Sequence, residues 1–120
     1  MNCRLTKEAE ADIVRILRRT KKLFGVVQVS TYAKIIEGGI AMIADNPVRP
    51  SSVDRSDLGA GVRSFHLELV TRRRHSASHM IYFKEMRSAS GDTEVVVIGV
   101  LSEAMEPKRR LNKALRGLET

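Results

Sequence analysis

The run VVVIGVL, Val95 to Leu101, is the longest apolar stretch in the sequence. It is far shorter than the roughly 20 apolar residues of a membrane-spanning helix, and it has the length of a β-strand. Both alternating sets of its side chains are apolar, so neither face of the strand can stay in water. The chain therefore needs a sheet with this strand at its centre, and helices that cover at least one face.

The first 25 residues predict an amphipathic helix. Thr6 is a good N-cap, since its hydroxyl can accept from an orphan amide of the first turn, and Gly25 is a plausible C-terminal cap. Apolar residues recur between them at helical spacing: Ile13, Ile16, Leu17 and Phe24. Basic residues lie mostly off that stripe: Arg15, Arg18, Arg19 and Lys22. We therefore expect a helix with a basic outer face.

A second helix is predicted from about Val27 to Asp45, with an apolar stripe that includes Tyr32 and Ile36. The pair Gly38-Gly39 costs about 1 kcal/mol per glycine relative to alanine. We interpret it as a site where the first helix approaches closely. Since the link between the helices is short, they should form an antiparallel hairpin.

Residues 47–61 have the composition of a loop, and the apolar pattern after them changes to period two. RSFHLELV, SHMIYFKE and TEVVVIGVL are predicted strands, Cys3 to Leu5 is a short one, and Pro107 begins a C-terminal helix. The prediction for residues 1–120 is a single α+β domain, with the helical hairpin packed on a small antiparallel β-sheet and a short C-terminal helix.

The formal net charge of +7 predicts a polyanionic partner: nucleic acid, an acidic protein segment or an anionic membrane surface. An aromatic content of 4% and the absence of Trp argue against a base-stacking platform. The single Cys3 cannot form an internal disulfide, and the charged start has no signal-peptide core. These features are typical of a cytoplasmic protein without a metal site.

Several short motifs occur in a fixed order: RLTKEAEADI, FG, DNP, LGAGVRSF, SHMIYFK and VVVIGVLSEAMEP. Together, from about Arg4 to Leu111, they resemble the ParE branch of the RelE/ParE superfamily of type II toxin–antitoxin toxins. The sequence differs from the family pattern at Ser78, where an Arg often precedes the His. It differs again at Ser102 and Ala104, where a His and an Arg are frequent.

The resemblance implies a cytoplasmic toxin that inhibits DNA gyrase by binding and needs no cofactor. It implies a cognate ParD-like antitoxin whose acidic C-terminal segment folds on the toxin. Contact with DNA would then be only indirect, through the antitoxin, and no membrane would be involved. The RelE branch instead cleaves mRNA on the ribosome, and this is the alternative function.

Two surfaces are predicted to bind macromolecules. The residues expected to contact the antitoxin lie in a basic turn between strands, in the VRSF motif, and in a groove between hairpin and sheet: Arg63, Arg72, Arg74, His79, Tyr32 and Ile36. Those expected to contact the target begin the basic C-terminal helix: Met105, Lys108, Arg109 and Arg110. A solvated loop, a buried stripe and a solvated helix are the simpler interpretations of the same patterns.

No catalytic residue is predicted. A histidine-based ribonuclease needs two imidazoles that bracket one phosphate, and His66, His75 and His79 are close in sequence. The simpler interpretation is that His66 and His79 are strand residues hydrogen-bonded to their neighbours.

Overall fold

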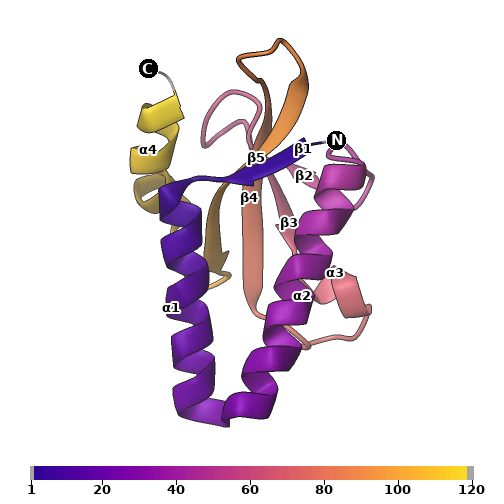
Figure 1. The fold of residues 1–120 in the computed structure, drawn as a ribbon, viewed down its shortest axis with the longest axis vertical. Helices are drawn as coiled ribbons and strands as arrows, with labels where there is room; N and C mark the ends of the chain where they lie inside the picture. Colours follow the sequence, from indigo (N-terminus) through magenta and orange to yellow (C-terminus); the bar gives the residue numbers. More distant parts are fainter. Residues whose placement is uncertain (1, 119–120) are drawn as a thin grey trace.

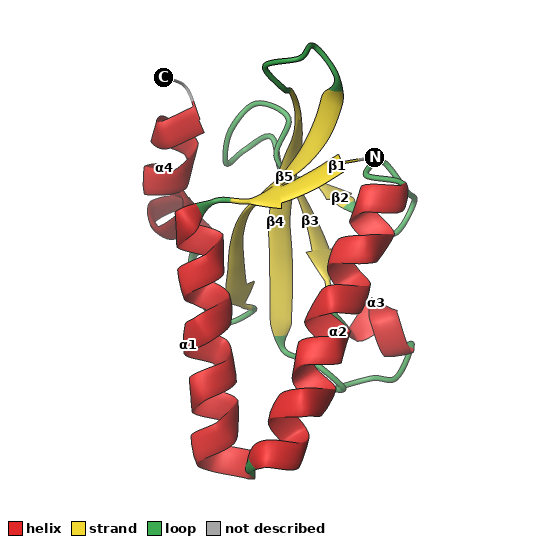
Figure 2. Cartoon of the chain, viewed as in Figure 1, coloured by secondary structure: helices red, strands yellow, loops and turns green. Residues whose placement is uncertain are grey.

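The computed structural model describes residues 2–118, and it contains a five-stranded sheet in the order β1-β5-β4-β3-β2 (Figures 1 and 2). The strands are β1 Asn2–Leu5, β2 Val53–Asp54, β3 Arg63–His66, β4 His79–Arg87 and β5 Thr93–Ser102. β1 pairs parallel to β5, and the other pairs are antiparallel. The α+β class is confirmed, and the sheet is mixed because the chain passes through two helices between β1 and the rest of the sheet.

The helical hairpin consists of α1, Lys7–Phe24, and α2, Val26–Asp45. The Thr6 hydroxyl accepts from the Ala9 amide at 3.1 Å, and Gly25 turns the chain at φ +91°. Figure 1 shows the turn between the helices extending past the end of the sheet. Phe24, predicted on the core stripe, is 68% exposed at this turn. That part of the prediction was wrong because the last turn of α1 has no sheet beneath it.

The apolar run forms β5, an interior strand between β1 and β4, whereas the middle strand of the sheet is β4. The side chains of Val95, Val96, Val97, Ile98 and Val100 are at most 2% exposed. One alternating set packs with α1 and α2, and the other packs with α4, Pro107–Leu118. Helices therefore cover both faces of this strand.

A β-bulge interrupts the pairing of β4 with β5. Tyr82 pairs with Gly99 and Phe83 pairs with Val97, which leaves one extra residue in β5.

The Asp12 carboxylate on α1 accepts from the Val100 amide at 3.1 Å, and its partial burial raises the pKa of Asp12. Asp12 thus ties α1 to β5 through its carboxylate.

The strand predicted over RSFHLELV ends early. β3 stops at His66, and Glu68–Thr71 form a short helix, α3. Leu67 and Val70, three residues apart, pack on the glycines of α2: a Cβ at Gly39 would lie 2.5 Å from Leu67 Cδ2, and one at Gly38 would lie 2.9 Å from Val70 Cγ1. Gly38 and Gly39 therefore allow the close approach of Leu67 and α3, and not of α1 as predicted from the sequence.

The stretch predicted as a loop, residues 47–61, contains the short strand β2, which pairs with β3. Two residues are too few to show a period-two pattern.

α2 is long and apolar enough to cross a membrane by length and composition alone. Its buried residues face the sheet and α3, as expected of a core helix: Ile35, Ile36, Gly39 and Ile43.

Two buried serines give a matched pair of stability predictions. Ser64 is 1% exposed and its hydroxyl has no hydrogen-bond partner within the described chain. Ser52 is 6% exposed, and its hydroxyl lies 3.0 Å from the carbonyl oxygens of Pro47 and Arg49 and accepts from Arg63 Nε at 2.9 Å.

An unsatisfied buried hydroxyl costs about 1–3 kcal/mol. We therefore expect Ser64→Ala to raise the free energy of unfolding by about 1 kcal/mol and Ser52→Ala to lower it by about 1–3 kcal/mol. Urea unfolding of both variants checks this. Equal destabilisation by the two substitutions would contradict it.

Candidate functional site

A groove of about 820 Å³ runs between α1 and the ends of β4 and β5. Apolar side chains form its floor and far end: Ile16, Leu23, Phe24, Val100, Leu101 and Met105. Leu23, Phe24 and Met105 are 55%, 68% and 40% exposed, so this apolar surface is open to a partner. Long exposed apolar surfaces with a polar rim are typical of binding sites for other macromolecules.

The rim of the groove is cationic. α1 contributes basic residues along one side, and the start of α4 contributes one more: Arg15, Arg18, Arg19, Lys22 and Arg110. Asp12 also lines the groove, but its carboxylate is held by the Val100 amide and is paired with Arg15. The groove therefore presents an apolar floor between positive edges, which suits a segment that is both apolar and acidic.

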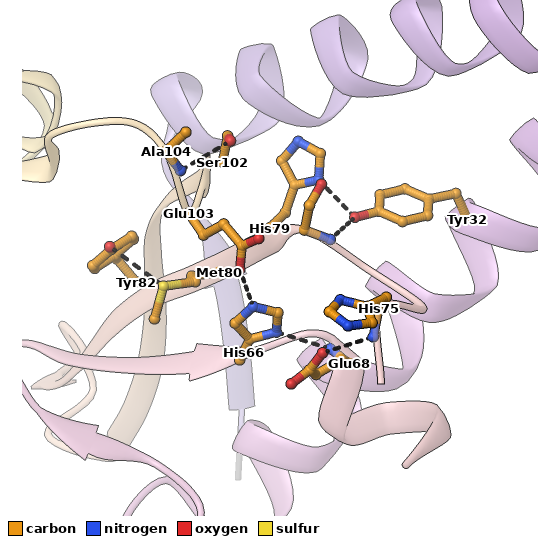
Figure 3. A network of polar contacts seen from close by, with 11 residues as sticks. Tyr32, His66, Glu68, His75, His79, Met80, Tyr82, Ser102, Glu103 and Ala104 are labelled. Carbon is orange, nitrogen blue, oxygen red and sulfur yellow. Dashed lines mark hydrogen bonds and ion pairs between the residues drawn. The ribbon is translucent and has the colours of Figure 1, made fainter. Parts of the chain in front are cut away.

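His79 and Tyr32 meet at the sheet end of the groove (Figure 3). Tyr32 Oη lies 2.6 Å from His79 Nδ1 and accepts from the Ser78 amide at 3.4 Å. The hydroxyl has one hydrogen and two lone pairs, so it can donate to Nδ1 while it accepts from the Ser78 amide. In the tautomer that accepts this hydrogen bond, neutral His79 carries its own proton on Nε2, where it can donate to a groove partner.

Burial lowers the pKa of His79 below its ordinary value of 6.5, and the neighbouring His66 lowers it further against the opposing effect of Glu103. As the pH falls from 7 to 5, the unfolded chain therefore takes up this proton before the folded chain does. The stability that neutral His79 contributes is present above that range and is lost within it.

We expect the free energy of unfolding of the wild-type chain to fall between pH 7 and pH 5. His79→Gln, which removes the titration and keeps a polar group near Tyr32, should flatten this dependence. Urea unfolding at pH 7, 6 and 5 measures both slopes. Identical slopes in the two proteins would show that His79 does not titrate in this way.

His66 lies on the other face of the sheet. It pairs with Met80, and neighbouring residues of β4 point to opposite faces, so His66 and His79 are separated by the strand (Figure 3). His66 Nδ1 accepts from the Glu68 amide at 3.2 Å, and Nε2 contacts Glu103 Oε2 at 2.8 Å. Both its nitrogens are occupied, so the two imidazoles do not bracket one phosphate.

The basic turn predicted between two strands lies instead between α3 and β4. Arg72 caps α3 in the left-handed conformation at φ +59°, and its amide donates to the Glu68 carbonyl at 2.9 Å. The side chains of Arg72, Arg74 and His75 are exposed.

Within residues 2–118, no group of three or more His, Cys, Asp or Glu residues is arranged to hold a metal ion.

The residues predicted to bind macromolecules lie in different environments in the structure. Ile36 is 2% exposed in the core, as the simpler interpretation of a buried stripe expects, and its contact with an antitoxin stays a prediction. Arg63 holds the 47–54 loop, with Nε 2.9 Å from Ser52 Oγ and Nη2 3.1 Å from the Ser52 carbonyl oxygen. Met105 and Arg110, predicted to contact a different partner from His79, line the same groove as His79.

Comparison with known proteins gives a family match and two relatives that cover most of the chain. Residues 3–107 match the family described as ParE toxin of type II toxin–antitoxin system, parDE. The chain is 28% identical to Toxin ParE1 of Caulobacter vibrioides over 108 residues, which cover 90% of this chain and 95% of that protein. It is 31% identical to Toxin ParE of Escherichia coli over 115 residues, which cover 94% and 95%. The chain belongs to the ParE toxin family of type II toxin–antitoxin systems.

Proposed function

We propose that this ParE-family toxin stops growth by binding DNA gyrase, and that a cognate antitoxin neutralises it through the groove beside α1. The observation that supports the antitoxin site most directly is the groove itself, with its apolar floor and its rim of arginine and lysine. An antitoxin segment with apolar residues on one face and carboxylates on its edges is complementary to both parts.

The groove offers such a segment two kinds of contact. The exposed Leu23, Phe24 and Met105 give apolar area to be buried. Arginine forks at the rim can hold carboxylates in bidentate pairs, and Nε2 of His79 can donate to a carbonyl or carboxylate oxygen. A positive rim also speeds the approach of an acidic chain.

Neutralisation follows from shared residues. Met105 and Arg110 line the groove, and they also belong to the surface proposed to contact gyrase, together with Lys108 and Arg109. A segment that occupies the groove would cover Met105 and Arg110. The antitoxin would thus exclude the target by competing for the same side chains.

The arrangement of the histidines supports action by binding over cleavage of RNA. His66 and His79 lie on opposite faces of β4, and His66 has no free nitrogen to serve as a base. A toxin that acts by binding needs neither a pair of imidazoles around one phosphate nor a free histidine base. With gyrase as its target, we place the protein in the cytoplasm.

Expression of the chain alone in bacteria tests this function. We expect growth to stop with an early loss of DNA synthesis, measured by thymidine incorporation, and with no codon-specific cuts in translated mRNA by primer extension. Co-expression of the antitoxin in the neighbouring reading frame should restore growth. Codon-specific cuts with DNA synthesis intact would favour the RelE-like endonuclease.

A further inference from the structure

The outer face of α4 is uniformly positive. Within Pro107–Leu118 the charged residues are all basic: Lys108, Arg109, Arg110, Lys113 and Arg116. At about 100° per residue, most of them lie opposite the apolar face of the helix. Leu111 and Ala114 on that apolar face are 1% and 2% exposed, so the helix is held firmly on the sheet with its cations outward.

These cations are exposed and outside the ion pairs found among residues 2–118. Glu106 is the acid next to the helix, but its carboxylate accepts from the Lys108 amide at 2.8 Å and the Arg109 amide at 3.2 Å. These hydrogen bonds lower the pKa of Glu106, and they engage its carboxylate with backbone amides.

We propose that this cationic face of α4 binds the phosphate backbone of duplex DNA directly. The groove beside α1 contains only Arg110 of the α4 cations, so the face remains available when the groove is occupied. The face shares Lys108 and Arg109 with the surface proposed to contact gyrase, and the DNA contact is distinct from any contact made through the antitoxin. It needs neither protein.

The composition of the face favours nucleic acid over an acidic protein. The exposed residues of α4 are its Lys and Arg together with Asn112 and Gly117, with no exposed apolar side chain among them. Protein interfaces have an apolar centre in which lysine is depleted, whereas nucleic-acid interfaces are strongly positive. α4 has no aromatic residue, and binding of single strands relies on aromatic stacking.

The geometry favours a duplex. α4 is packed on the sheet by Leu111 and Ala114, so only its cationic face can approach the phosphates that border the roughly 12 Å wide major groove of a duplex. Each phosphate contact contributes about −0.9 to the slope of log affinity against log salt. Contact by the four cations outside the groove predicts a slope near about −3.6, or a roughly 100-fold loss of affinity between 50 and 200 mM salt.

The test measures binding of the full-length toxin, without antitoxin or gyrase, to a labelled 30-base-pair duplex of arbitrary sequence by fluorescence anisotropy. The α4 variant is Lys108→Gln, Arg109→Gln, Lys113→Gln, Arg116→Gln. The control is Lys7→Gln, Lys21→Gln, Lys34→Gln, Arg87→Gln, which changes the net charge equally at exposed positions outside α4 and the groove. Circular dichroism and urea unfolding establish that both variants are folded.

We expect the wild type and the control to bind with the steep salt dependence, and the α4 variant to bind about 100-fold more weakly with a slope near zero. Equal losses in both variants would overturn the proposal, since binding would then follow net charge alone. It would also be overturned if the duplex failed to bind at low salt, or if polyglutamate or a single strand bound as tightly with the same sensitivity to the α4 substitutions.

Discussion

Exchange of Arg19 and Lys22 for glutamate is expected to weaken binding of the antitoxin's acidic segment by a factor of about 100 or more. Both residues line the groove on the α1 side. Placing carboxylates beside carboxylates costs several kcal/mol, and each 1.4 kcal/mol is about tenfold in affinity. Isothermal titration of the purified toxin with the antitoxin's C-terminal peptide measures the change.

The matched control is Lys7→Glu with Lys34→Glu, which alters net charge by the same amount at exposed positions that do not line the groove. We expect its affinity to change less than about tenfold, through long-range steering alone. If the control weakened binding as much as the groove variant, net charge and not the groove would be responsible.

The second large effect concerns two phenylalanines that the sequence does not distinguish. Phe65 is fully buried between the sheet and the hairpin, and Phe24 is 68% exposed at the end of α1. Removal of a buried phenylalanine side chain costs about 3–5 kcal/mol. Phe65→Ala should therefore remove much of the stability of a domain this size, which is typically about 5–15 kcal/mol.

Phe24→Ala should change the free energy of unfolding by less than about 0.5 kcal/mol, as exposed substitutions usually do. It should nevertheless weaken peptide binding, because Phe24 lines the groove. Urea unfolding and titration on the same two proteins separate the effects. A large loss of stability in Phe24→Ala would mean that the end of the hairpin is packed and not available for binding.

The sequence predicts the parts of the fold that depend on local patterns. The apolar run at Val95 predicts that β5 is a buried interior strand, and Thr6 and Gly25 mark the bounds of α1. It misplaces the segment after β3, because Leu67 and Leu69 alternate like strand residues. In the structure, Leu67 and Val70 are used at helical spacing to contact α2.

The site is less accessible to sequence reasoning because it joins distant segments. Tyr32 and His79, both predicted, are 47 residues apart, and their hydrogen bond has no local signature. The basic side of α1 is visible from the spacing of its arginines, but its alignment with Met105 and Arg110 depends on how α4 packs on the sheet. Burial of Ile36 likewise depends on packing, because an apolar stripe in the sequence does not show how much of it neighbouring elements cover.

The central claim is that this toxin acts by binding gyrase and that the groove is where it is neutralised. The most direct measurement is DNA supercoiling by purified gyrase in the presence of the toxin, with and without the antitoxin's C-terminal peptide. The account predicts inhibition at micromolar toxin, relief by the peptide, and no relief for the Arg19→Glu, Lys22→Glu variant if that variant still inhibits. Undiminished supercoiling at micromolar wild-type toxin would contradict it.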